Sequence, residues 1–317
     1  MNRRNVLTSG MSMFAGAAAG TAGGTALSAR RAGPANPKAP GPAAATFITS
    51  RDGTALFCRD WGEGAPIVFA SPWALGSDWW EYQMADLTAR GMRCIAYDRR
   101  GQDRSEQPKG GYDFDTLSDD LAAVIGSLNL RGVTLVGQSM GAGEAVRYLS
   151  RHGTARVSRL VLIAPITPRV LKSTDNPDGF DPAFLVKVRA ALCKDRPGNI
   201  GAAAPAFFGS PANTVSVEMM QWWAQMLLRC PLNVMLSLHH AFTETDFTDD
   251  VRAVRCPTLI IQGDQDTSTP LEFTGRTTAK LISGSRLQIY EGAAHGLPIT
   301  HTERLNEDLR TFANVAT

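Results

Sequence analysis

Short apolar runs, each bounded by turn-forming residues, recur along the chain and predict buried strands. They occupy residues 66–70, 93–97, 133–136, 160–163, 258–261 and 287–290. Between them, apolar residues recur with helical spacing, which predicts helices at residues 79–90, 117–128, 143–151, 271–281 and 305–312. Strands and helices therefore alternate over most of the chain.

Continuously apolar strands that alternate with helices are typical of a mainly parallel sheet covered by helices on both faces. Residues 46–61 add a predicted antiparallel hairpin at one edge. The six runs and this hairpin together predict an α/β fold with a mainly parallel, eight-stranded sheet flanked by helices.

The alternation stops at residues 165–251, where apolar helical segments follow one another without a clear strand. We interpret this stretch as a helical cap inserted between two core segments, residues 46–164 and 252–317. The cap is rich in large apolar side chains, namely Phe207, Phe208, Met219, Met220, Trp222, Trp223, Met226 and Leu227. They either roof a binding cavity or form the interface between cap and core.

The amino terminus has the order of an export signal. Arg3 and Arg4 precede a weakly hydrophobic Gly/Ala stretch, which predicts a twin-arginine signal over residues 1–29 and export to the periplasm or beyond. Residues 30–45, rich in Pro and Ala, are expected to form an extended linker. The stretch is too weakly apolar for a stable membrane span, and the alternative is the frayed tail of a cytoplasmic protein.

Composition narrows the range of partners. The formal charge of +2 is nearly balanced and no basic patch is visible, so we expect a small-molecule substrate and no nucleic acid. The five cysteines show no CxxC spacing, which argues against a zinc site. Export would permit a bridge between Cys193 and Cys230, which the sequence leaves open, as it does the oligomeric state.

Residues 137–141 form a GxSxG motif directly after an apolar strand and directly before a helix. A serine on such a tight turn has its hydroxyl exposed above the sheet, and Gly137 and Gly141 relieve the crowding of the turn. The amino end of the following helix also favours developing negative charge. The motif in this context predicts Ser139 as a nucleophile.

A serine hydroxyl needs a neighbouring base, and the base needs a group that orients it. His295 follows the last predicted strand, where a loop can fold back to Ser139, whereas the other histidines suit packing, capping or surface roles; these are His152, His239, His240 and His301. Asp264 and Asp266 both follow the strand at 258–261. Position alone does not choose between these two carboxylates.

Together with other motifs, these residues resemble the α/β-hydrolase superfamily and, within it, the cofactor-free haloperoxidase and arylesterase branch. The motifs are YDRRGQDRS at 97–105, NPDG at 176–179 and TETDF at 243–247, and the resemblance covers about residues 46–312. It implies the α/β-hydrolase fold, Asp266 as the acid and His295 as the base. It implies no metal and no organic cofactor.

The resemblance also implies an oxyanion hole made by the backbone N–H groups of Trp73 and Met140. The chain departs from the family at Ser71 and Pro72, where His-Gly is usual. It also has glutamine at three positions where the family usually has histidine, namely Gln102, Gln138 and Gln262. Glutamine donates and accepts hydrogen bonds without titrating near neutrality, so we expect altered hydrogen bonding around the site.

The leading functional hypothesis is a serine hydrolase that cleaves a small or medium ester or lactone through an acyl-enzyme. Trp73, Phe207, Trp222 and Trp223 are the candidate pocket residues. In the alternative, peroxide replaces water and a peracid forms; relatives that favour this reaction often have proline after the tryptophan, where this chain has Ala74. A third hypothesis is a ligand-binding protein with little turnover.

Overall fold

The computed structural model describes residues 43–314. The predicted signal over residues 1–29 lies outside the described residues, as does the linker up to residue 42. No helix within 43–314 has the length and apolarity needed to cross a membrane.

A single eight-stranded sheet in the order β1-β2-β4-β3-β5-β6-β7-β8 forms the centre of the described chain. β1 and β2 are antiparallel to each other, β2 is antiparallel to β4, and the remaining pairs are parallel. The strands are β1 (Ala43–Thr49), β2 (Ala55–Trp61), β3 (Ala65–Ala70), β4 (Met92–Tyr97), β5 (Val133–Gln138), β6 (Val157–Ile163), β7 (Thr258–Gly263) and β8 (Arg286–Tyr290). The predicted mainly parallel sheet and its antiparallel edge hairpin are confirmed.

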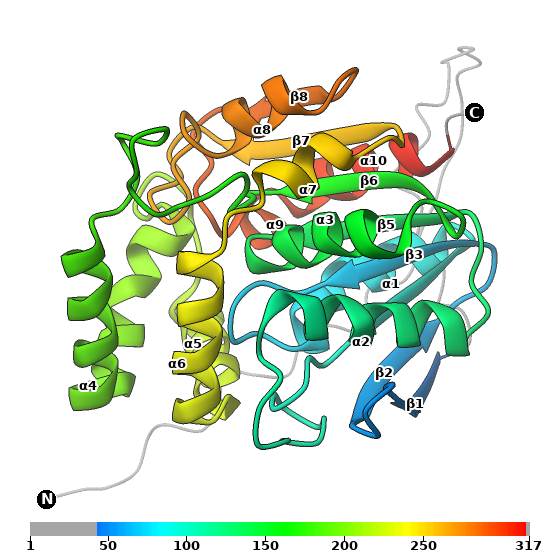
Figure 1. Ribbon diagram of the computed structural model, residues 1–317, viewed down its shortest axis with the longest axis horizontal. Coiled ribbons are helices and arrows are strands. Elements are labelled where there is room, and N and C mark those ends of the chain that lie inside the picture. Colours follow the sequence, from blue (N-terminus) through cyan, green and yellow to red (C-terminus); the bar gives the residue numbers. More distant parts are fainter. Residues whose placement is uncertain (1–42, 315–317) are drawn as a thin grey trace, which may run out of the picture. The chain divides into compact units, whose positions relative to one another are not determined.

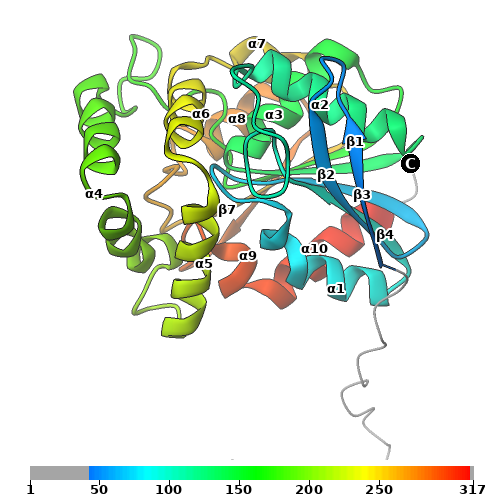
Figure 2. The same cartoon turned by 90° about the horizontal axis from the view of Figure 1, so that it is seen from below.

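The parallel strands are buried because helices cover both faces, as their continuous apolar sequences require. α1, α9 and α10 lie on one side of the sheet, and α2, α3, α7 and α8 lie on the other (Figures 1 and 2). The helices are α1 (Glu81–Ala89), α2 (Phe114–Ser127), α3 (Met140–His152), α4 (Pro182–Phe208), α5 (Val217–Arg229), α6 (Leu232–Glu244), α7 (Thr248–Ala253), α8 (Gly275–Leu281), α9 (Leu297–Thr300) and α10 (Thr302–Asn314).

The first strand begins earlier than expected. We predicted a linker up to residue 45, but β1 already pairs with β2 from Ala43 onward. Ala43, Ala44 and Ala45 are exposed, so no apolar pattern marks them as a strand. Their place in the sheet comes from backbone hydrogen bonds, which a composition rich in alanine does not reveal.

The predicted cap contains α4, α5 and α6, which lie together beside one end of the sheet (Figure 1). α4 is kinked at Asp195, whose carboxylate accepts the N–H of Gly198 at 2.9 Å and so caps the second half of the helix. α7 was predicted as part of the cap, but it packs on core helix α3 because Phe247, which precedes it, is buried against Phe114 of α2.

Cys193 and Cys230, whose pairing the sequence left open, do not form a disulfide in the structure. Cys193 lies on the exposed side of α4, whereas Cys230 is buried at the end of α5, and both are free thiols. The two side chains therefore face different environments. Burial raises the pKa of the Cys230 thiol to about 12, so it is not a reactive thiolate.

A buried ion pair fastens α3 to the loop after β3. The guanidinium of Arg99 contacts the Glu144 carboxylate of α3 at 2.8 Å, and both side chains are almost completely enclosed. Arg99 also donates to the Ser71 carbonyl at 2.8 Å and to the Pro72 carbonyl at 3.5 Å. Burial raises the pKa of Glu144 and so opposes its charged form, whereas a guanidinium at 2.8 Å favours it.

We expect Glu144→Gln to lower the free energy of unfolding by about 3 to 5 kcal/mol, because it leaves the buried Arg99 charge uncompensated. Urea denaturation measures the change. The matched control is Glu307→Gln, which breaks the exposed pair with Arg310 on α10 and should leave the midpoint unchanged. Similar midpoint shifts in both variants would show that the buried Arg99–Glu144 pair contributes no more to stability than an exposed ion pair.

Candidate active site

Ser139 occupies a strained turn between β5 and α3. Its backbone has φ 53° and ψ −114°, a conformation that few non-glycine residues adopt. The turn is closely packed, since a Cβ added at Gly141 would lie 2.2 Å from the carbonyl oxygen of Ala70 at the end of β3. The glycine predicted to relieve crowding thus allows α3 to approach the loop after β3.

His295 and Asp266 form a buried pair. His295 Nδ1 lies 2.8 Å from Asp266 Oδ2, although the two residues come from the separate loops after β8 and β7. Asp264, the other carboxylate that the sequence left open, is exposed and accepts the N–H of Gly292 at 2.8 Å. The structure therefore brings Asp266, and not Asp264, to the imidazole.

Thr269 supports this pair, and the sequence reasoning missed it. Its N–H and that of Ser268 donate to Asp266 Oδ1 at 3.0 and 2.9 Å, and its hydroxyl donates to Oδ2 at 2.9 Å. A threonine three residues after a loop aspartate is a signal for such a turn. These donors satisfy the buried carboxylate and fix its orientation toward His295.

The Ser139 turn is joined to the His295 loop through the preceding residue. Gln138 Nε2 donates to the His295 carbonyl at 3.0 Å, and its Oε1 accepts the indole N–H of Trp79 at 2.6 Å. Within residues 43–314, no hydrogen bond joins the Ser139 hydroxyl to the His295 ring. In proteins without bound substrate, such bonds are often long and tighten only when substrate binds.

The loop after β3 carries the two predicted departures, Ser71 and Pro72. The Ser71 hydroxyl donates to the Gly76 carbonyl and accepts the indole N–H of Trp80, both at 3.1 Å. These bonds hold the turn without the usual histidine. The backbone N–H of Trp73 donates to no backbone carbonyl within residues 43–314, which leaves it free for a ligand.

The indole of Trp73 joins this loop to the cap. Its Nε1 donates to the Met235 carbonyl of α6 at 2.9 Å, and its ring meets that of His239 at 5.5 Å. Met140 is the first residue of α3, so its N–H has no intrahelical acceptor. Both predicted oxyanion donors are thus backbone N–H groups that the secondary structure leaves unpaired.

The three pocket candidates of the cap, Phe207, Trp222 and Trp223, do not all lie together. Phe207 lies against His295, with ring centroids 5.4 Å apart, and Trp223 packs on Phe207 at 4.6 Å. Trp222 instead packs against Tyr82 of α1, since neighbouring helical side chains point in different directions. The structure therefore places Phe207 against the histidine with Trp223 packed behind it, and turns Trp222 toward α1.

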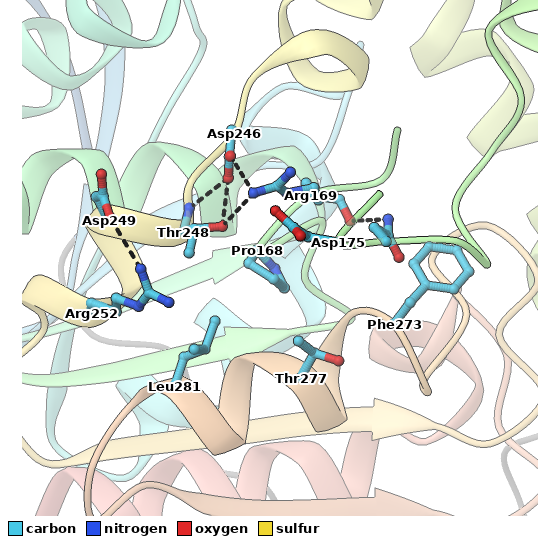
Figure 3. A pocket seen from close by; sticks show the side chains of 11 residues that line it. Pro168, Arg169, Asp175, Asp246, Thr248, Asp249, Arg252, Phe273, Thr277 and Leu281 are labelled. Atoms are coloured by element: carbon cyan, nitrogen blue, oxygen red, sulfur yellow. Dashed lines mark hydrogen bonds and ion pairs between the residues drawn. The ribbon is translucent and has the colours of Figure 1, made fainter. Parts of the chain in front are cut away.

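A polar cavity of about 480 Å³ lies apart from these residues, between α7, α8 and the loop before α4 (Figure 3). Its lining includes Arg169, which pairs with Asp246 and donates to the Thr248 hydroxyl at 3.1 Å. Asn176 donates to the Arg169 carbonyl at 3.3 Å. The NPDG and TETDF motifs thus meet here in a hydrogen-bonded framework.

Residues 43–314 contain no cluster of metal-ligating side chains.

Comparison with known proteins agrees with this geometry. Residues 65–302 match the family of proteins with the alpha/beta hydrolase fold. A non-heme haloperoxidase from Rhodococcus erythropolis is 39% identical over 84% of this chain and 98% of the relative. A bifunctional esterase/perhydrolase from Acinetobacter calcoaceticus is 34% identical over the same share of each. The crystal structure of a bromoperoxidase from Bacillus anthracis superimposes with a TM-score of 0.81 at 34% identity, covering 85% of this chain and 99% of the other.

The chain therefore belongs to the family of α/β hydrolases. Its relatives place it in the cofactor-free, haloperoxidase-like branch of that family, as the sequence motifs indicated.

We expect Gly141→Ala to destabilise the protein by about 1 to 3 kcal/mol, because the new methyl group would press on the Ala70 carbonyl and push α3 from the loop. Thermal unfolding measures the effect. Gly126→Ala is the matched control in α2, where an added Cβ meets nothing within 4 Å, and it should be neutral or stabilising. A stable Gly141→Ala protein would contradict the close packing of the turn.

Proposed function

We propose that the protein is a carboxylic ester hydrolase with Ser139 as nucleophile, His295 as base and Asp266 as the group that orients His295. The observation that carries the proposal is the buried His295–Asp266 pair, whose histidine loop is bonded through Gln138 to the turn that bears Ser139. A ligand-binding protein has no physical need for such a pair beside a strained serine.

In the proposed reaction, His295 takes the proton of Ser139 as the hydroxyl attacks the substrate carbonyl. The N–H groups of Trp73 and Met140 donate hydrogen bonds to the oxyanion of the tetrahedral intermediate and stabilise its negative charge. His295 then gives the proton to the departing alcohol, which leaves an acyl group on Ser139. Water, deprotonated by the same histidine, releases the acid and restores the serine.

The contacts of the cap suggest the kind of substrate. Phe207 and Trp223 form an aromatic pair next to His295, and Trp73, in the loop after β3, packs against His239 and Phe242 of α6. Burial and the Arg189 guanidinium lower the pKa of His239, beside Trp73, to about 4, so this imidazole is neutral at pH 7. These uncharged side chains favour a small or medium uncharged ester or lactone.

We expect Ser139→Ala to abolish labelling by a fluorophosphonate probe and to lower kcat for p-nitrophenyl esters at least about 10⁴-fold. Asp266→Asn should lower kcat by about 10⁴-fold, because the imidazole loses its orienting acceptor. Asp264→Asn is the matched control, and its kcat should change by less than about threefold because this carboxylate only holds a turn. An unlabelled wild-type protein, or a larger loss with Asp264→Asn, would refute the assignment.

Perhydrolysis is a second candidate, because relatives carry the names haloperoxidase and esterase/perhydrolase. One feature of this chain favours water over peroxide. Ala74, where proline would be associated with perhydrolysis, has φ 59°. Proline is restricted to φ near −65°, so the loop of this chain has a shape that a proline there could not keep.

We therefore expect ester hydrolysis to exceed peroxide-dependent bromination in acetate buffer, measured with the same protein sample. Ala74→Pro should lower hydrolysis by about tenfold or more, because the loop must change its backbone at the oxyanion donor. A wild-type ratio that favours bromination would reverse the order of the two candidates.

A further inference from the structure

Two glutamines at the carboxyl ends of core strands β5 and β7, which flank β6, are completely buried. Gln138 is the last residue of β5, and Gln262 precedes the last residue of β7. Both side chains have no exposed surface. A buried amide needs partners for both its N–H and its oxygen, so the partners of these two side chains reveal what they hold.

Gln138 holds the loop of the proposed base. Its amide donates to the backbone carbonyl of His295 itself and accepts from Trp79, which is also fully buried. Trp79 meets Phe207 at a ring distance of 5.9 Å, and Phe207 meets His295 at 5.4 Å. Gln138 thus contacts His295 in two ways: directly at its backbone carbonyl, and through Trp79 and Phe207 at one side of its ring.

Gln262 holds the loop of the proposed acid. Its Nε2 donates to the Thr269 carbonyl and, at 3.1 Å, to the Thr274 hydroxyl. Thr269 in turn supplies the N–H and hydroxyl bonds to Asp266. At Gly275 an added Cβ would lie 2.1 Å from Gln262 Oε1, so the start of α8 leaves room for this amide.

An amide offers a donor nitrogen and an acceptor oxygen together at every pH near neutrality. A histidine or a carboxylate in the same place would exchange a donor for an acceptor when it titrated. With glutamine at both positions, the contacts that orient His295 and Asp266 stay constant while the pair itself gains or loses its proton.

We propose that Gln138 and Gln262 are positioning residues that hold the base and the acid in a frame that does not titrate. This inference rests on the proposed function. Neither amide reaches the reacting atoms, so both act through the backbone of His295 and through Thr269.

The test uses Gln138→Glu, which preserves the shape of the side chain. A protonated carboxyl group donates to the His295 carbonyl and accepts from Trp79 as glutamine does, whereas an ionised one cannot donate. On the facing loop after β8, His295 is buried and Glu291 is exposed. Burial of the new carboxyl group favours its neutral form. We expect kcat relative to wild type to fall about 10- to 100-fold as the pH rises from about 6 to about 9, with KM within about threefold.

Gln83→Glu is the matched control. Gln83 is equally buried and its Nε2 donates to a backbone carbonyl, that of Pro298, at 2.8 Å. Its kcat ratio to wild type should not depend on pH. Thermal unfolding at each pH gives the folded fraction, and every kcat is corrected for it. A purely structural role would change the folded fraction and leave the corrected kcat unchanged.

Gln262→Glu extends the test to the acid, and it carries the test alone if Gln138→Glu does not fold. Its Nε2 position loses the donor to Thr269 on ionisation, so its kcat should show the same fall with pH. A flat ratio for the folded variant, or the same fall with Gln83→Glu, would overturn the inference. If wild-type protein hydrolyses esters and is labelled at Ser139, that result leaves the proposed function standing; an unlabelled wild type instead refutes the function itself.

Discussion

The buried pair of Arg99 and Glu144 is the interaction on which the site depends. Arg99 lies after β4, Glu144 lies on the helix that follows Ser139, and Arg99 also binds two carbonyl groups of the loop after β3. A charge taken out of water must be compensated nearby, so this one side chain fixes three segments relative to each other. The close approach of the loop after β3 to Gly141, in the turn that bears Ser139, agrees with that constraint.

The same end of the sheet gathers the remaining chemistry because parallel strands present their carboxyl ends together. Ser139 follows β5, Asp266 follows β7 and His295 follows β8, and each loop is fastened by a different buried polar group. Gln138 connects the first loop to the third, and Thr269 fixes the second. From the cap, Phe207 packs against His295, and the Met235 carbonyl of α6 accepts the indole N–H of Trp73.

Much of this arrangement is predictable from the sequence because it depends on local pattern. The period of the apolar positions predicts the strands and helices, and GxSxG between a strand and a helix identifies the turn at Ser139. The prediction failed where local pattern carried no signal. Ala43 joins a strand through its backbone alone. The burial of Phe247 against Phe114 places α7 on the core. Trp222 faces Tyr82, although the adjacent Trp223 faces Phe207.

By itself, the sequence determined the fold class and the strand-to-helix turn at Ser139, since both depend on residues that are neighbours along the chain. Position along the chain left Asp264 and Asp266 open, and the family resemblance implied Asp266; the tertiary structure shows Asp266 against the histidine and shows which partners Gln138 and Gln262 hold. Those choices depend on how loops far apart in sequence approach one another. Side-chain direction and the need to satisfy each buried polar group settle them, and neither is visible until the strands are paired.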